Sequence, residues 1–245
     1  MKRFVLAIAL TLPFIGFSQD NGVPEMTYVG LDQRTTLVTA WAYYEGHLIP
    51  ANYLIVEGDS SSILMDTPWN DEQTEEIIAW SKKHLDVPIS IAVITHAHVD
   101  RMGGIATLHK NGIRTYIHED AQTMNAKEDG YEPAQNVFSS YPYRFDLGGV
   151  EINVIDPGTG HAPGNLILTI GRHGTYGGCF IKSYVSKDIG NLSHADLPSW
   201  KRALEESQVY FERKAWVIPG HGKVGPGSYE RTVQLVNEAM SMSEE

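Results

Sequence analysis

The stretch ITHAHVDRMGG, residues 94–104, constrains this chain more than any other part of its sequence. It completes the apolar run ISIAVIT, which is typical of a buried strand. His96, His98 and Asp100 then stand at alternate positions, and a pair of glycines follows. Because glycine allows a tight turn and a close approach of the next element, the three polar side chains can converge where the strand ends. The segment is either a metal site or a loop of solvated polar residues.

Three further stretches favour the metal site. His161 lies in PGTGHAPGN, Cys179 in GGCFIKS and His221 in PGHG. Each stands beside glycine at the end of a predicted strand, where α/β proteins build their sites. Imidazole, thiolate and carboxylate are the groups that bind zinc in proteins. Six such groups suffice for two tetrahedral ions that keep an open position for water.

The remaining pattern alternates strands with helices. Apolar strand-like runs include TTLVTAWAYY, NYLIVEG and SSILMD in the first half, and VEINVID, LILTI, TYGGCFI and AWVIP in the second. Helical spacing is found over residues 71–85, which open with Asp and Glu, and in IATLHKNG, which ends at Gly112. Two more helices are expected over residues 198–214 and from about residue 229. The alternation predicts a layered α/β architecture with sheet inside and helices outside.

The N-terminus reads MKRFVLAIALTLPFIGFSQD, with two basic residues, an apolar run too short to span a bilayer comfortably, and small polar residues after it. This pattern predicts a secretory signal peptide over residues 1–18, cut near Ser18, and a single domain over residues 19–245. An uncleaved membrane anchor is the less favoured alternative. The expected location is the periplasm, an oxidising compartment where the single cysteine, Cys179, cannot form an internal disulfide. Its sulfur is either inert in the core or protected, as a metal ion would protect it.

Composition and charge limit the possible partners. The 245 residues are 42% hydrophobic, which suits one globular domain with a sizeable core. Removing the signal takes away two of the 19 basic residues and none of the 30 acidic ones, which moves the net charge from −11 to −13. A phosphate backbone would be repelled by such a surface, so nucleic acid is not expected as a partner.

Taken together, the motifs resemble those of the metallo-β-lactamases, specifically the di-zinc subclass B1. The resemblance runs over nearly the whole mature chain, through LMDTPW, THAHVDRMGG, GHAPGNLI, GGCFIKS, DIGNLSHAD and PGHG in the expected order. The HxHxD element alone indicates only the wider metallo-hydrolase superfamily, which includes glyoxalase II and nucleases. Cys179 with Lys182 three residues later is the specific part, because most other branches have an aspartate where this cysteine falls.

The resemblance implies an αββα sandwich, with two mixed β-sheets, helices on the outer faces and two zinc ions at one edge. The activity it implies is hydrolysis of the β-lactam amide of penicillins, cephalosporins and, as a further expectation, carbapenems, by a zinc-bound hydroxide, which would confer resistance. A monomer without a membrane anchor is expected. The resemblance assigns His96, His98 and His161 to the first zinc ion, and Asp100, Cys179 and His221 to the second.

Further residues receive roles from the same resemblance. Asn165 would help to stabilise the developing oxyanion, Asp100 would orient the hydroxide, and Lys182 would pair with the carboxylate of the substrate. Asp66 would orient a metal ligand, with the capping of a turn as the alternative. Arg101 would lie beneath the second zinc ion, unless it is a plain surface arginine. The segments YYEGHLI and GNLSHADLPSW would form opposite walls of the substrate site, through which His47 and His194 could approach substrate.

One departure leaves other functions open. The family usually has threonine after its third histidine and aspartate before the asparagine, where this chain has Ala162 and Gly164. The lost hydroxyl and carboxylate are expected to loosen the hydrogen bonding around His161 or Asn165. A di-zinc hydrolase of another ester, thioester or lactone is therefore the alternative, and a secreted zinc-binding protein without catalysis is a third interpretation. An open coordination position argues against the last, because structural zinc is enclosed by protein ligands.

Overall fold

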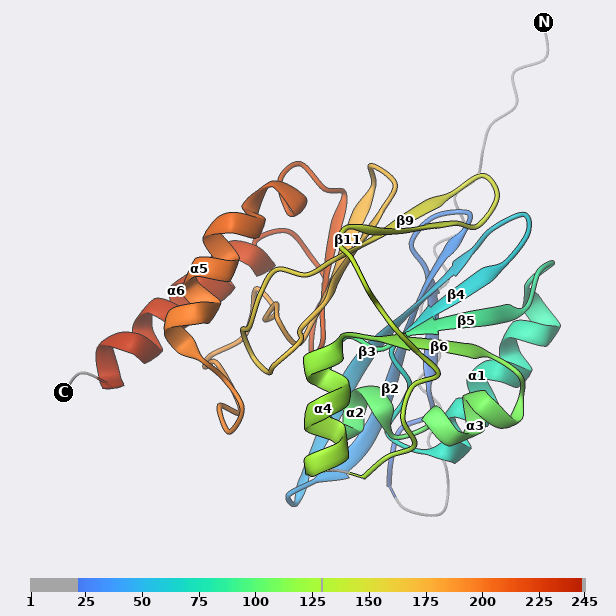
Figure 1. Cartoon of the computed structure of the whole chain (residues 1–245), viewed down its shortest axis with the longest axis horizontal. Coiled ribbons are helices and arrows are strands. Elements are labelled where there is room, and N and C mark those ends of the chain that lie inside the picture. The colour runs from blue at the N-terminus through green and yellow to red at the C-terminus, as the bar shows by residue number, and fades with distance from the viewer. Residues whose placement is uncertain (1–21, 129, 244–245) are drawn as a thin grey trace, which may run out of the picture.

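Two mixed β-sheets form the centre of the molecule, as the computed structural model of residues 22–128 and 130–243 shows (Figure 1). In the first sheet the strands lie in sequence order from β1 to β7. Strands β1 to β4 pair antiparallel, and β4 to β7 pair parallel. These strands are β1 (Thr27–Gly30), β2 (Thr35–Tyr44), β3 (His47–Glu57), β4 (Ser62–Met65), β5 (Ile89–Val93), β6 (Arg114–Ile117) and β7 (Asn136–Val137).

The second sheet has the order β12-β11-β10-β9-β8. Its strands pair antiparallel except for β11 and β12, which run parallel. Strands β9, β11 and β12 therefore end at the same edge of this sheet. Their bounds are β8 (Tyr143–Asp146), β9 (Glu151–Ile155), β10 (Ile167–Ile170), β11 (Gly174–Gly178) and β12 (Trp216–Pro219).

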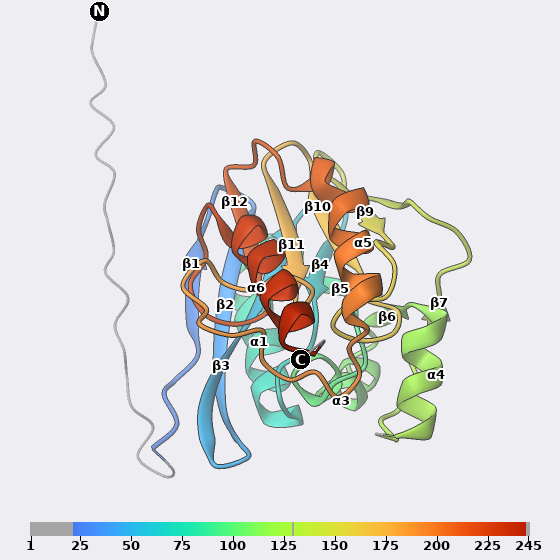
Figure 2. The ribbon, with the colours of Figure 1, turned by 90° about the vertical axis from the view of Figure 1, so that its left-hand side faces the viewer.

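Helices cover the outer faces of both sheets. Helices α5 and α6 lie along one side of the molecule and α1 and α3 along the other, with the strands between them (Figures 1 and 2). This is the αββα arrangement that the family resemblance implies. The helices are α1 (Asp71–His84), α2 (Val99–Met102), α3 (Ile105–Lys110), α4 (Glu119–Lys127), α5 (Leu197–Ser207) and α6 (Ser228–Ser243).

Strands β4, β10 and β12 are buried on both faces, which is why they read as continuous hydrophobic runs. Successive side chains of a strand point to opposite faces. In β4, Ile63 and Met65 pack between the two sheets, whereas Leu64 packs beneath the helices of the first sheet. The second sheet buries its other face against α5 and α6, through residues such as Ile167 and Trp200. Both sheets are thus held rigidly, and their edges can carry a site.

Several elements differ from the sequence-based expectation. The helix expected over residues 198–214 ends at Ser207 and continues only as a 3₁₀ turn over Gln208–Tyr210. The segment after β5 forms the helical turn α2, so Asp100 lies on a helix rather than on an extended loop. Helix α4 was not expected, since it buries only a few residues, among them Ala121 and Met124.

The expected signal peptide, residues 1–18, lies outside the described residues. Within the parts of the chain that the structure describes, no helix is long and apolar enough to cross a membrane.

Candidate metal centre

All six predicted metal ligands come together at one edge of the two sheets. The segment carrying His96 follows β5, and the loop carrying His161 follows β9. Cys179 is the first residue after β11, and His221 follows β12 by one glycine. The potential ligand atoms form overlapping groups in which all atoms lie within 4.8 Å of one another. These groups are His96, His98 and Asp100; His96, His161 and Cys179; and Asp100, Cys179 and His221.

The three histidines assigned to the first zinc ion meet edge to face. The ring centroids of His96, His98 and His161 lie 4.7 to 5.1 Å apart. Nδ1 of His98 is 3.2 Å from Nε2 of His161. Burial lowers the pKa of all three imidazoles, that of His98 to about 4, so they are neutral and their lone pairs are available.

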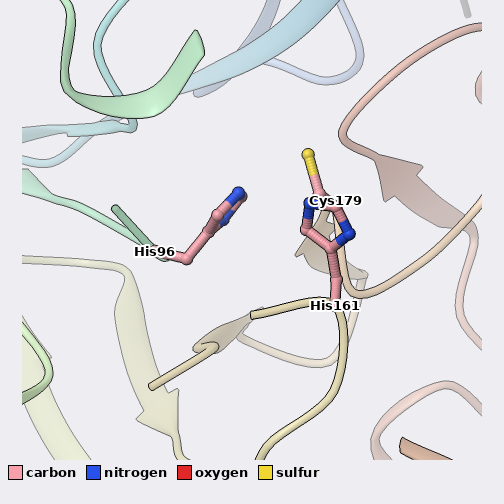
Figure 3. A group of neighbouring side chains, drawn as sticks. All are labelled: His96, His161 and Cys179. Atoms are coloured by element: carbon pink, nitrogen blue, oxygen red, sulfur yellow. The ribbon is translucent and has the colours of Figure 1, made fainter. Parts of the chain in front are cut away.

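An orphaned nitrogen in this group fits a metal ion. Nε2 of His96 is buried and has no hydrogen-bond partner among the described residues. A buried polar atom of this kind is costly unless a ligand binds it. Figure 3 shows His96, His161 and Cys179 arriving from three separate segments, with their side chains in the same region. Imidazole, thiolate and carboxylate together are the donor set that zinc prefers.

Asp100, Cys179 and His221 form the second predicted group. Sγ of Cys179 lies 3.6 Å from Oδ2 of Asp100 and 3.3 Å from Nε2 of His221, and these last two atoms are 3.1 Å apart. Nδ1 of His221 is 2.7 Å from the carbonyl oxygen of Pro50. Because a carbonyl only accepts, Nδ1 donates there, and Nε2 is the nitrogen that faces the group.

The electrostatics of the second group favour a cation. Burial alone would lower the pKa of His221, but the neighbouring Cys179 and Asp100 raise it to about 9. A proton held between Cys179 and Asp100 is one that a metal ion can replace, since metal binding releases protons from its ligands.

Arg101 is a buried part of this centre and not a surface residue. It is completely buried, and one of its guanidinium nitrogens lies 2.8 Å from Oδ2 of Asp100. Burial raises the pKa of Asp100, but Arg101 and His221 together hold it well below its usual range. The guanidinium also donates to Sγ of Cys179 (3.1 Å), the carbonyls of Asn52 and Gly220 (both 2.8 Å) and the hydroxyl of Tyr176 (3.1 Å).

Asp66 supports the ligands through its neighbours rather than directly. Its carboxylate accepts from the backbone N–H and the hydroxyl of Thr95, at 2.7 and 2.9 Å. The Thr95 hydroxyl in turn lies 3.3 Å from Nδ1 of His96. Asp66 also faces Arg101, 3.5 Å away, yet its complete burial raises its pKa to about 6. The expected direct hydrogen bond from Asp66 to a metal ligand is absent among the described contacts. Asp66 instead reaches His96 through the hydroxyl of Thr95.

Glycines let the strand ends approach closely enough to build the centre. A Cβ on Gly220 would lie 2.6 Å from Sγ of Cys179 and 2.8 Å from a guanidinium nitrogen of Arg101. A Cβ on Gly103 would lie 2.1 Å from the carbonyl oxygen of Trp69. The close approach that the sequence predicts after HAHVD is therefore present, although Gly103 itself has ordinary helical backbone angles.

Asn52 supports the loop that carries His221, a role that the sequence did not predict. Its side-chain N–H groups donate to the carbonyls of Pro219 and Gly222, each at 2.9 Å, which flank His221. The position of Asn52 inside the apolar run of β3 could have indicated such a role, because a buried amide requires hydrogen-bond partners.

The metal centre opens into a cleft of about 580 Å³. Tyr44, Ile49 and Trp69 line this cleft, and residues between Ser186 and His194 contribute to its lining as well. The two segments expected to form the walls of the site therefore both border the cleft. Histidines, Cys179 and Asp100 of the metal centre lie among its lining residues.

Lys182 lies in the same cleft. Its ammonium is 5.4 Å from the ring centroid of Trp200, whose own ring is completely buried. Burial lowers the pKa of Lys182 from its ordinary value. A cation held over an aromatic face in a cleft is positioned to receive an anionic group of a ligand.

Asn165 does not reach the cleft. It is completely buried, and its side-chain oxygen accepts from the backbone N–H of Ala162 at 2.8 Å. Its amide nitrogen has no hydrogen-bond partner in the described part of the chain. The structure thus places it beneath the His161 loop, whereas Asn191 lines the cleft.

The two departures from the family pattern have local reasons. Ala162 is completely buried in an apolar cluster with Ile94 and Met102, where a methyl group fits. Gly164 has φ +66°, and a Cβ there would lie 2.6 Å from the backbone nitrogen of Ala121 in α4. The aspartate of the family would be strained at this position.

Comparison with known proteins identifies the family. Residues 48–189 match the model of the metallo-β-lactamase superfamily. The metallo-β-lactamase type 2 of Bacillus cereus is 33% identical over 198 residues, which cover 80% of this chain and 76% of the relative.

Solved structures show the same architecture. A metallo-β-lactamase from Pontibacter korlensis superposes with a TM-score of 0.82 at 28% identity, covering 87% of this chain and 99% of that one. The metallo-β-lactamase FIM-1 from Pseudomonas aeruginosa, in its mono-zinc form, gives a TM-score of 0.77 at 37% identity, covering 87% and 96%.

The chain belongs to the metallo-β-lactamase superfamily. The expected fold and the expected enzyme class, a metallo-β-lactamase, are confirmed. Membership also implies zinc binding, for which the clustered histidine, aspartate and cysteine side chains provide candidate ligands.

Proposed function

We propose that this protein is a di-zinc β-lactamase of subclass B1, which opens the amide of penicillins, cephalosporins and carbapenems. The observation that carries the proposal is the meeting of two ligand groups, one of histidines and one with Cys179, in a single cleft beside Lys182. The names of its relatives support the same activity.

Each zinc ion would have its own ligand set. His96, His98 and His161 would hold the first, and their neutral rings suit metal binding. Asp100, Cys179 and His221 would hold the second, since a carboxylate, a sulfur and an imidazole nitrogen are groups that zinc prefers. When bound, zinc supplies Lewis acidity and lowers the pKa of a coordinated water to about 7.

The residues of the chain would position substrate and water around that chemistry. Asp100 would orient the attacking water, because Arg101 holds one of its oxygens at 2.8 Å. Lys182 would bind the carboxylate that β-lactams carry next to the amide nitrogen. Asn191 borders the cleft and is better placed than the buried Asn165 to contact substrate.

We also propose that the protein acts in the periplasm, after removal of the signal peptide over residues 1–18. A location where β-lactams meet the cell wall machinery is consistent with a role in resistance. The basic, apolar and polar sequence of the N-terminus supports this proposal.

Hydrolysis assays test the proposal. The purified mature protein is given two equivalents of zinc and either a chromogenic cephalosporin or a carbapenem, with and without EDTA. Rapid opening that EDTA abolishes is expected. Lys182→Ala is expected to raise KM at least tenfold with a smaller effect on kcat, because it removes uniform binding of the substrate carboxylate. A protein that holds two zinc ions but opens neither compound would refute the β-lactamase assignment and point to lactones or thioesters.

A further inference from the structure

A hydrogen-bonded chain of three side chains leads out of the metal centre. Nε2 of His98 lies 2.9 Å from Nδ1 of His194, and Nε2 of His194 lies 2.5 Å from Oε2 of Glu128. Glu128 is the C-cap of α4, and His194 stands on the loop before α5. These hydrogen bonds thus connect Glu128 and His194, which are 66 residues apart in the sequence, to His98, a predicted zinc ligand.

The carboxylate at the end fixes the first hydrogen bond of this relay, and the neutral form of His194 fixes the second. A carboxylate can only accept, so Nε2 of His194 donates to Glu128. In a neutral imidazole the other nitrogen then accepts, so Nδ1 of His194 receives the proton of Nε2 of His98. The lone pair of His98 is consequently left on Nδ1, the nitrogen that faces His161 at 3.2 Å.

We propose that Glu128 and His194 are positioning residues that set the tautomer and the ring orientation of His98 for metal binding. The inference rests on the proposed role of His98 as a zinc ligand. Metal-bound histidines almost always donate their second N–H to a fixed acceptor, which makes them better ligands. Here the acceptor is a second imidazole, and the carboxylate acts through it.

The location of His194 and Glu128 supports a positioning role, because their ion pair contributes little to stability by itself. The side chain of Glu128 is 47% exposed and that of His194 is 26% exposed, so the pair alone would stabilise the fold only slightly. His194 also lines the cleft, beside the ligands. Its effect is therefore expected on the metal centre rather than on folding.

The first experiment reads the tautomers directly. Long-range ¹H–¹⁵N NMR spectra of the zinc-loaded protein report which ring nitrogen of each histidine carries a proton, and His194→Ala assigns the His194 signals. The proposal predicts protons on Nε2 of both His98 and His194. A proton on Nδ1 of His194 would overturn it, because His98 would then have to accept at Nε2.

The second experiment measures zinc affinity by competition with a chelator. His194→Ala is expected to weaken the zinc site of His98 by about 10- to 100-fold, the range found when partners of metal ligands are removed. Glu128→Ala, which removes the acceptor of His194, is expected to weaken the same site in the same direction. The thermal unfolding of the metal-free variants should stay within about 2 °C of the parent, as for an exposed ion pair. Zinc affinities within twofold of the parent in both variants would refute the role.

A matched control is available on the same protein. Glu132 lies 2.9 Å from Nδ1 of His109, in a similarly exposed carboxylate–histidine pair away from the cleft. Glu132→Ala should leave zinc affinity unchanged. Neither readout requires a β-lactam, so a protein that binds zinc in the predicted way but opens no β-lactam would refute the proposed function and leave this inference intact.

Discussion

Arg101 offers the most direct test of how the metal centre is built. Its guanidinium is completely buried and faces two buried carboxylates, Asp100 at 2.8 Å and Asp66 at 3.5 Å. Arg101→Met keeps much of the side-chain volume and removes the charge. Both carboxylates then lose their cation, and the carbonyls of Asn52 and Gly220 lose a donor.

The expected cost of Arg101→Met follows from this arrangement. Removing one partner of a buried ion pair destabilises a protein by about 3–5 kcal/mol, because an uncompensated charge stays buried. We expect a loss in this range in the free energy of unfolding of the metal-free protein, measured by urea denaturation in EDTA at pH 7. Arg101→Lys should recover only part of it, since an ammonium cannot reproduce the fork of hydrogen bonds.

Arg34 provides the control for this prediction. It forms an ion pair of 2.7 Å with Asp59, but the two side chains are 40% and 65% exposed. Arg34→Met should cost no more than about 1 kcal/mol, as is usual for surface pairs. A loss below about 1 kcal/mol for Arg101→Met would refute the view that Arg101 neutralises the buried carboxylates.

Three further predictions concern Cys179, Asp66 and Gly164. Cys179→Ala removes the only thiol of the predicted ligand set. It should reduce bound zinc, measured by elemental analysis, from two equivalents toward one, and slow hydrolysis on the order of 100-fold. Full retention of both ions with unchanged turnover would contradict the assignment. The pKa of Asp66 is raised to about 6, so the folded state binds a proton at Asp66 more readily than the unfolded chain does. The stability that protonated Asp66 contributes is therefore complete below about pH 4 and is lost as pH rises through 6. Metal-free protein should therefore lose up to about 3 kcal/mol relative to Asp66→Asn between pH 4 and 7 in denaturation experiments, and a pH-independent difference would contradict this. Gly164→Asp should destabilise the protein by about 1–3 kcal/mol in thermal unfolding, because its φ of +66° and the contact with α4 leave no room for a Cβ, and a gain in stability would contradict the steric explanation.

The sequence was most informative where apolar runs end beside glycine. The segments after β5, β9, β11 and β12 could be placed at one edge because parallel strand ends coincide there. The helix α1 was also predictable, since its apolar spacing and acidic first turn are local signals. The layers of the fold followed from the same alternation.

Contacts between residues far apart in the sequence could not be predicted from the sequence alone. Glu128 reaches His194 only because α4 ends near the loop that precedes α5, and nothing in the local sequence of α4 indicates this. Asn165 follows a candidate ligand by four residues, which suggested a substrate contact, but its side chain turns inward to the backbone of Ala162. Side-chain direction after a glycine-rich turn depends on backbone angles that the residue types leave open.

A zinc titration tests the central claim most directly. Metal-free protein is titrated with zinc while bound metal and hydrolysis of a chromogenic cephalosporin are measured on the same samples. We predict that bound zinc saturates at two equivalents per chain and that the rate of ring opening rises with zinc bound to these sites. Saturation at two equivalents with no ring opening at any point, or ring opening that persists in fully metal-free protein, would contradict the account.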